Sequence, residues 1–249
     1  MKYHEGDFKN KKITIMGLGL LGRGLGDAKF FAEEGADIII TDLKKEEELK
    51  ESLKELSQYK NIKYTLGEHK IDDFKNRDFI LKAAGVPLGS PFIIETKKNN
   101  IPIEMDASLF ASLAHGVILI GITGTRGKTT TTTLIYKIIS QAFEGSEKKV
   151  YLGGNIQGVA TLPLIKKVKE GDIVILELDS WQLQGFGDAC LSPHIAVFTN
   201  FMNDHLNYYK GDLNMYLKDK ANIFLYQKKD DYLVAGSKVT KEIISKFGS

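Results

Sequence analysis

One glycine-rich stretch has the residue types that bind the phosphates of a nucleotide: GITGTRGKTT, residues 121–130. An apolar run, Val117 to Ile120, precedes it and a segment without Gly or Pro, Thr129 to Ser140, follows, so we predict a loop between a buried strand and a helix N-terminus. Such a loop offers free backbone N–H groups and a helix dipole, while Lys128 adds a cation and Thr129 a hydroxyl for Mg2+. The sequence therefore predicts a triphosphate site made by Gly124, Thr125, Arg126, Gly127, Lys128, Thr129 and Thr130.

The glycine spacing differs from that of the usual P-loop. Five residues lie between Gly121 and Gly127 where the usual motif has four, and Ile122 takes the place of the first glycine. The stretch matches a tighter Gly-Thr-x-Gly-Lys-Thr form instead. The alternative is a glycine-rich turn with an incidental lysine.

A second glycine pattern, Gly17-x-Gly19-x-x-Gly22, follows the β-rich run Lys12 to Met16. The next segment has helical spacing of its apolar residues, and Asp42 ends a second buried run about 20 residues beyond the glycines. This order is typical of a Rossmann-type nucleotide domain. Taken alone it also fits a nicotinamide-dependent oxidoreductase, although that interpretation leaves the second half of the chain unexplained.

Strand-like and helix-like segments alternate along the chain, which predicts an α/β protein with parallel sheets. We expect a Rossmann-like domain over residues 1–106 and a P-loop-type α/β domain over 107–249, with Ala107 to His115 as a connecting helix. A further helix is expected around 158–169. The central domain is expected to be incomplete at its C-terminal end.

In the first domain, ligands should bind at the carboxyl ends of the strands. This places Gly17 to Gly22, Asp42 and the loop Ala83 to Pro87 around one crevice. Glu68 and His69 are expected to be solvated surface residues.

Polar residues also follow the predicted strands of the second domain. Glu177 comes directly after the apolar run Ile173 to Leu176, which suits a carboxylate ligand for Mg2+ beside the phosphate loop. Asn155 follows Gly153-Gly154 and His205 follows a strand that ends at Asn200, although His205 could equally cap or pack a turn. Lys220, in an amphipathic helix, is by default a solvated residue.

Composition excludes several classes of function. The 249 residues carry 34 basic and 32 acidic side chains, a net charge of +2, which argues against a general nucleic-acid binder. Cys190 is the single cysteine, so no intrachain disulfide can form, and no apolar run has the length of a membrane span. We expect a cytoplasmic monomer without a membrane partner.

Five motifs occur in the order of a known family. They are Gly124 to Thr130, Gly153-Gly154-Asn155-Ile156, Glu177 to Leu183, Asn203-Asp204-His205-Leu206 and Tyr216 to Phe224. This series resembles the signature of the Mur ligases. The turn Gly17 to Leu20 and Asp42 resemble the uridine-nucleotide domain of the branch that adds D-glutamate to UDP-N-acetylmuramoyl-L-alanine.

The resemblance implies roles that the spacing alone does not give. Lys128, Thr129 and the loop amides would hold ATP phosphates and Mg2+, while Glu177 and His205 would face a second Mg2+. Lys220 matches the family's carbamylated lysine, whose carbamate helps to build that metal site. Three groups of residues are implied in binding the muramoyl substrate: Asn155 with His205, Leu20 with Leu21, and Asp42, which would accept from the base.

The implied reaction is ATP-dependent amide synthesis in the assembly of peptidoglycan precursors. A substrate carboxylate attacks the γ-phosphate to give an acyl phosphate and ADP, and the amino group of D-glutamate then displaces phosphate. Asp179 stands where the family more often has serine, and the loop Ala83 to Pro87 replaces a Ser-Pro-Gly-Ile-Pro type. Family members also carry a C-terminal domain that binds the amino acid, so a non-catalytic UDP-sugar or nucleotide-binding module remains an alternative.

Overall fold

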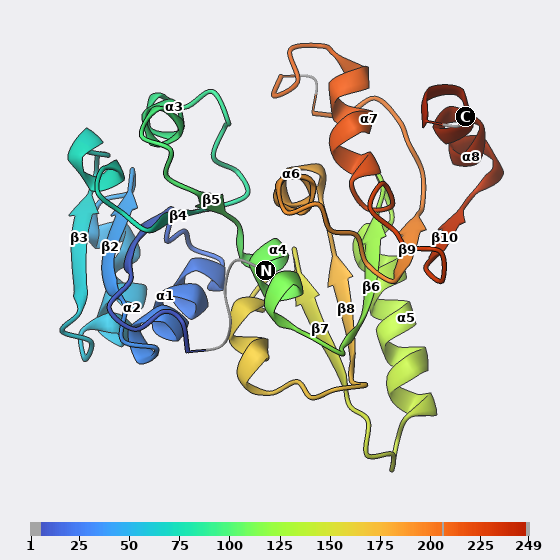
Figure 1. The fold of residues 1–249 in the computed structure, drawn as a ribbon, viewed down its shortest axis with the longest axis horizontal. Coiled ribbons are helices and arrows are strands. Elements are labelled where there is room, and N and C mark those ends of the chain that lie inside the picture. The colour runs from blue at the N-terminus through green and yellow to red at the C-terminus, as the bar shows by residue number, and fades with distance from the viewer. Residues whose placement is uncertain (1–5, 206, 248–249) are drawn as a thin grey trace. The chain divides into compact units, whose positions relative to one another are not determined.

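The computed structural model describes residues 6–205 and 207–247, and the chain forms two compact units (Figure 1). The first unit runs to Leu113 and also takes in Gln157–Lys166, whereas the second consists of Ala114–Ile156 and the chain from Lys167 onward. The first unit is therefore discontinuous in sequence. Helix α4 (Asp106–Leu113) belongs to it by its contacts, and the domain boundary near Asp106 stays a proposal.

The first unit holds a five-stranded parallel sheet in the order β3-β2-β1-β4-β5. This is the Rossmann order, whose switch point lies between β1 and β4. The strands are β1 (Lys12–Met16), β2 (Asp37–Asp42), β3 (Ile62–Leu66), β4 (Phe79–Lys82) and β5 (Ile103–Glu104). The remaining helices are α1 (Arg23–Glu33), α2 (Glu46–Leu56), α3 (Pro91–Lys98) and the 3-10 helices η1 (Ile71–Phe74) and η2 (Leu162–Lys166).

The second unit holds another five-stranded parallel sheet, in the order β10-β9-β6-β8-β7. Its central strand β6 leads into the glycine-rich loop. The strands are β6 (Ile118–Thr123), β7 (Val150–Gly154), β8 (Ile173–Glu177), β9 (Ile195–Phe198) and β10 (Tyr232–Ala235). The helices are α5 (Lys128–Ala142), α6 (Ser180–Asp188), α7 (Leu213–Ala221) and α8 (Ser237–Phe247).

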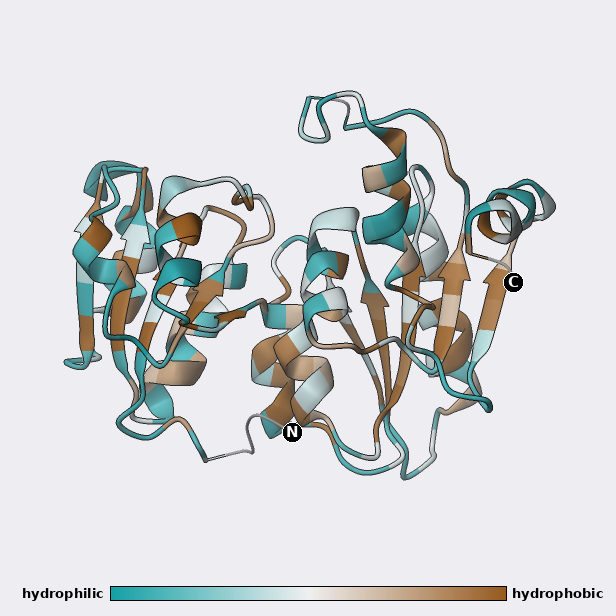
Figure 2. Ribbon diagram, turned by 45° about the horizontal axis from the view of Figure 1, so that its top comes forward, coloured by the Kyte–Doolittle hydropathy of each residue, from teal (hydrophilic) through white to brown (hydrophobic). Residues whose placement is uncertain are grey.

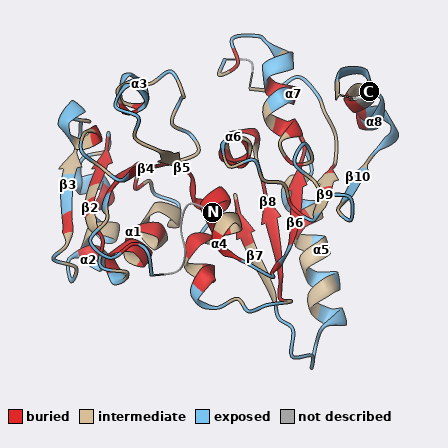
Figure 3. Cartoon of the chain, viewed as in Figure 1, coloured by how far each residue is buried: buried red, intermediate tan, exposed pale blue. Residues whose placement is uncertain are grey.

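Apolar side chains gather in the strands of both sheets, as the brown segments of Figure 2 show. All five residues of β8 are buried (Figure 3), as expected for a central strand covered on both faces. In the first unit Phe8, Phe31 and Phe79 pack edge to face, with ring centroids 5.0–6.2 Å apart. Among the helices of the described residues, none has the length and apolar character needed to cross a membrane.

Three local expectations differ from the structure. The helix expected around 158–169 is only the short η2, and the proline at position 163 limits regular helix there. Helix α6 was not expected; it begins at a capping box of Asp179 and Gln182. His69 is only partly solvated, because its Nδ1 lies 2.7 Å from the Thr41 hydroxyl and its ring packs against an aromatic side chain, that of Phe92.

Candidate functional site

The phosphate loop lies between the end of β6 and the start of α5, as the sequence predicts. Gly127 is the N-cap of α5 with φ 80°, a left-handed conformation that favours glycine. Gly124 has φ 146°, and a Cβ atom there would collide with the side chain of Thr199. Two glycines of the motif are therefore required by backbone geometry, and Ile122 is free to be a buried strand residue.

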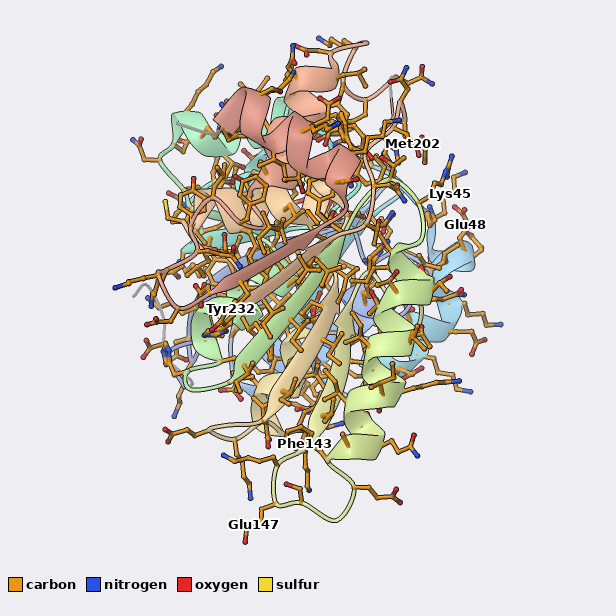
Figure 4. The ribbon with its side chains drawn as sticks, turned by 90° about the vertical axis from the view of Figure 1, so that its right-hand side faces the viewer. Lys45, Glu48, Phe143, Glu147, Met202 and Tyr232 are labelled. Carbon is orange, nitrogen blue, oxygen red and sulfur yellow. The ribbon has the colours of Figure 1, made fainter. Side chains whose placement is uncertain are left out.

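The residues after β9 hold the phosphate loop in place. The Arg126 amide donates to Asn200 Oδ1 at 2.8 Å, and Asn200 Nδ2 donates back to the Arg126 carbonyl at 3.0 Å. The Thr125 hydroxyl accepts from the Met202 amide at 3.0 Å, and Figure 4 shows Met202 beside the loop that leads into α5. Thr199 and Asn200 were missed from the sequence, because no local motif marks them.

Lys128 lies across the loop that it follows. Its Nζ donates to the carbonyls of Gly124 and Thr125 at 3.2 and 3.3 Å. Thr129 and Thr130 are exposed at the N-terminus of α5, whose first amides point out of the helix. One cation, two hydroxyls and the positive end of a helix dipole thus lie at the start of α5, a combination that suits the binding of a phosphate chain.

Lys220 is buried beside this loop, not on a solvated helix face. Its side chain is 1 % exposed, and its Nζ donates to the Gly124 carbonyl at 2.8 Å and lies 4.9 Å from the centre of the Tyr216 ring. Burial, with a smaller effect from the Lys128 charge, lowers the pKa of Lys220 to about 7. The solvated-face interpretation is therefore wrong, since Lys220 lies one turn from the buried Tyr216 on the same face of α7.

Glu177 ends β8 as a buried carboxylate. Its Oε1 accepts from Asn155 Nδ2 at 3.2 Å, while Oε2 is buried without a hydrogen-bond partner among residues 6–205 and 207–247. The backbone of Gly154, with φ 83°, approaches Glu177 so closely that a Cβ atom would collide. A buried carboxylate oxygen without a partner fits a divalent cation, since ionised carboxylates are buried when paired or bound to metal.

The ring of His205 packs against aromatic side chains. Its ring centroid lies 5.0 Å from that of Trp181 and 5.7 Å from that of Tyr216, and its amide donates to Asp204 at 2.8 Å. This hydrogen bond from the backbone amide lowers the pKa of Asp204, and nearby positive charges that include Arg126 act in the same direction. No group of three or more His, Cys, Asp or Glu side chains is arranged for a metal within the described part of the chain. Leu206, the last motif residue, lies outside the described residues.

Asp179, which departs from the expected serine, has a structural function. Its Oδ1 accepts from the Gln182 amide at 2.8 Å, so it is the N-cap of α6. Serine and aspartate are both strong N-cap residues. The departure therefore preserves the cap at this position.

The first unit has its own cavity at the carboxyl ends of β1 and β4, about 390 Å3 in volume. The glycine turn, with the exposed Leu20 and Leu21, lines it together with the loop after β4. Asp42 is buried beneath the turn and accepts from the amides of Gly19 and Lys44 at 3.0 and 2.9 Å. These contacts fix the shape of the turn. Asp42 lies behind the turn and is not itself one of the residues that line the cavity.

The loop Ala83 to Pro87 folds around a buried amine at the end of β4. Lys82 Nζ donates to the carbonyls of Ala83 and Val86 at 3.3 and 3.1 Å. A Cβ atom on Gly17, which has φ 99°, would lie 2.9 Å from Ala83 Cβ. Small residues on both sides therefore let the two loops approach each other at the cavity.

Two family descriptions match the chain. The Mur ligase middle domain matches residues 122–247, and the N-terminal domain of the MurD-like Mur ligases matches residues 11–104. The UDP-N-acetylmuramoylalanine--D-glutamate ligase of Borreliella burgdorferi is 38% identical over 98% of this chain and 51% of its own length. The ligase of the same name from Clostridioides difficile is 36% identical over 92% and 48%. The chain thus spans about half the length of the curated relatives it matches.

Solved structures support the fold. A UDP-N-acetylmuramate:L-alanyl-gamma-D-glutamyl-meso-diaminopimelate ligase from Neisseria meningitides matches with a TM-score of 0.62 at 16% identity, over 96% of this chain and 76% of that one. The UDP-N-acetylmuramate-alanine ligase of Thermotoga maritima matches with a TM-score of 0.51 at 21% identity, over 92% and 49%. Two parallel α/β sheets with a phosphate loop after β6, and the matches to both domains, lead to one assignment: the chain belongs to the Mur ligase family.

Proposed function

We propose that this chain supplies the nucleotide-binding part of an ATP-dependent ligase that joins D-glutamate to UDP-N-acetylmuramoyl-L-alanine in peptidoglycan precursor synthesis. The observation that carries the proposal is the loop after β6, where Lys128 and Lys220 both donate to Gly124. The names of relatives at 36–38% identity support the choice of substrates. Residues 1–106 would bind the uridine substrate and residues 107–249 the ATP.

The reaction needs no protein nucleophile. A carboxylate oxygen of the muramoyl substrate forms a bond to the γ-phosphorus as the bond to ADP breaks, and the amine of D-glutamate then displaces phosphate from the acyl phosphate. The difficulty is the repulsion between the carboxylate and the triphosphate. Lys128 and the N-terminus of α5 would offset that repulsion by neutralising charge and fixing orientation.

We propose that this site holds two Mg2+ ions. Thr129 would hold one with the ATP phosphates, and Glu177, with its unpartnered Oε2, and His205 would hold the second. Bound there, Mg2+ would withdraw charge from phosphate and carboxylate oxygens. The chain's contribution is the buried position of Glu177, which Asn155 fixes through the other oxygen.

Lys220 is the residue proposed to carry a carbamate. An amine with a pKa near 7 is largely uncharged at mildly alkaline pH. The uncharged amine is the form that attacks CO2, with loss of a proton. The added carboxylate would give the second metal a further oxygen ligand. The burial of Lys220 beside Gly124 supports a position for this carbamate next to the phosphate loop.

The uridine end of the substrate is proposed to lie in the cavity of the first unit. Leu20 and Leu21 offer exposed apolar contacts there, and Asp42 holds the turn and would accept from the base. Asn155 and His205 are also proposed to bind the muramoyl part. We further propose that the protein works as a monomer in the cytoplasm.

The test has a binding arm and a turnover arm. Calorimetry on this chain should show binding of Mg-ATP and of UDP-N-acetylmuramoyl-L-alanine. Fusion of the chain to the remaining C-terminal half of the Borreliella burgdorferi ligase should give ADP release that requires D-glutamate, with that native ligase as positive control. Binding of NAD(H) but of no UDP-sugar would instead favour an oxidoreductase. Binding of both ligands with no ADP from a folded fusion would favour a binding module.

A further inference from the structure

A buried acid lines the nucleotide cavity of the first unit, and the proposed reaction leaves it unused. Asp27 lies one turn into α1, is 4 % exposed and forms part of the cavity wall. Its Oδ1 is buried and has no hydrogen-bond partner in the part of the chain that the structure describes. A buried polar atom without a partner costs free energy, and here a bound ligand could supply the missing partner.

A second acid faces the same cavity. Asp106, the first residue of α4, is 9 % exposed and also lines the wall. Burial, together with the like charge of Asp106, raises the pKa of Asp27 well above its ordinary range, while Arg23 acts in the opposite direction. Asp27 therefore favours the neutral, protonated form, which has an O–H group to donate.

Charged side chains reach this cavity from each of the surrounding elements: Arg23 on α1, Asp106 on α4, Lys82 at the end of β4 and Lys44 after β2. Lys82 directs its amine at loop carbonyls, and Lys166 on η2 is paired with Glu33 near the far end of α1. Arg23 is thus the cation that lowers the pKa of Asp27. A cation site is disfavoured, because Arg23 already brings positive charge to the wall.

We propose that Asp27 is a substrate-positioning residue that, as a neutral carboxylic acid, donates a hydrogen bond to a diphosphate oxygen of the UDP-substrate in this cavity. The proposal rests on the proposed function for the identity of that substrate. Two ionised carboxylates would repel a diphosphate, whereas a protonated Asp27 adds a donor to the N–H groups of the glycine turn. The same proton reduces the repulsion between Asp27 and Asp106.

The test is the pH dependence of binding, measured by calorimetry with UDP-N-acetylmuramoyl-L-alanine, a diphosphodiester whose phosphate charge is constant from about pH 5.5 to about pH 8.5. Affinity of the wild-type chain should fall as the pH rises and Asp27 ionises. Asp27→Asn keeps a neutral donor of the same shape, so its affinity should stay constant. Asp72→Asn, at an exposed site on η1, is the matched control and should follow the wild type.

Removal of the donor gives a second readout. Asp27→Leu should weaken binding of the UDP-substrate by about ten- to a hundredfold, the effect of one hydrogen bond to a charged group. Uridine, which lacks the diphosphate, should bind wild type and variant equally. If Asp27→Leu does not fold, the pH profiles of wild type and Asp27→Asn still decide the question.

Three outcomes would overturn the inference, each with a distinct meaning. Equal, pH-independent affinities of wild type, Asp27→Asn and Asp27→Leu would show that the carboxyl does not contact the substrate. Affinity that rises with pH and requires Mg2+ would make Asp27 an ionised metal ligand. Absence of UDP-substrate binding by the folded wild type at every pH would refute the proposed function of the cavity, and the proposal about Asp27 with it.

Discussion

Lys128 and Lys220 donate to the same carbonyl oxygen, that of Gly124, at 3.2 and 2.8 Å. The first amine follows the loop directly, and the second comes from α7, 96 residues after Gly124 in the chain. Lys128 is partly buried, whereas Lys220 is almost wholly buried and its amine titrates near neutrality. Two amines from distant parts of the chain thus meet at one carbonyl of the loop.

Replacement of Lys128 by alanine should abolish detectable ATP binding, a loss of about a hundredfold or more, because the variant lacks the cation that we propose to contact the phosphates. Binding of UDP-N-acetylmuramoyl-L-alanine should be unchanged, since its proposed cavity is lined by the first unit. Calorimetry with each ligand measures both effects. Lys137→Ala, an exposed lysine of the same helix, should bind both normally, and parallel loss of both ligands in Lys128→Ala would contradict the two-site assignment.

Lys220 should make stability depend on pH. Its pKa is lowered from 10.5 unfolded to about 7 folded, so the unfolded chain binds more protons between these values. The free energy of unfolding should therefore rise with pH from about 7 to 10.5. Below about pH 7 this stabilisation by the uncharged Lys220 should be absent. Urea unfolding of wild type and Lys220→Met, compared pH by pH, isolates it as a difference of a few kcal/mol.

The effect of bicarbonate on the wild type and on Lys220→Met tests whether Lys220 carries a carbamate. Added bicarbonate should raise the melting temperature of the wild type at mildly alkaline pH and leave Lys220→Met unchanged, because only a neutral amine forms the carbamate. Identical pH profiles of the two proteins would mean that Lys220 is charged and solvated in solution.

The two glycines of the phosphate loop should differ in their tolerance of alanine. Gly127 has φ 80° and open space around it, so Gly127→Ala should cost about 1–2 kcal/mol, the price of a left-handed L-residue. Gly124→Ala should cost more, because its Cβ would also meet Thr199 and the Asn200 backbone. Denaturant midpoints measure both, and equal losses would argue against the tight packing of Gly124.

Asp179 should be replaceable by serine but not by alanine. Both aspartate and serine can accept the Gln182 amide, whereas Asp179→Ala removes the N-cap of α6 and should cost about 1 kcal/mol. Urea unfolding of the two variants gives the comparison. A serine variant as unstable as the alanine variant would show that the aspartate charge, and not the cap, is what matters.

The sequence was sufficient where structure follows from neighbouring residues. The apolar run, the glycines and the Gly-free segment around Lys128 predicted strand, loop and helix, and the same reasoning predicted β1 and its turn. Alternation of elements predicted two parallel sheets, which both occur. Each of these inferences depends on backbone conformation within a few residues.

Contacts between distant segments could not be predicted in this way. The burial of Lys220 depends on how α7 packs, and the support of Arg126 by Asn200 depends on β9 lying next to β6. The charge effect of Asp106 on Asp27 has no local signal in the sequence, since one is an ordinary helix residue and the other opens a different helix. Such contacts arise from tertiary packing, which outweighs local preference.

The first unit is completed by Gln157–Lys166, which the chain reaches only after β6, α5 and β7 of the second unit. In that segment Ala160 packs so closely on Gly26 of α1 that a Cβ at Gly26 would collide with it. During synthesis the ribosome must therefore release the segment Ala114–Ile156 of the second unit before α1 acquires this neighbour. The first unit therefore cannot complete its folding until part of the second unit has been synthesised. A permuted gene that joins residues 157–166 directly to the first unit would remove this dependence.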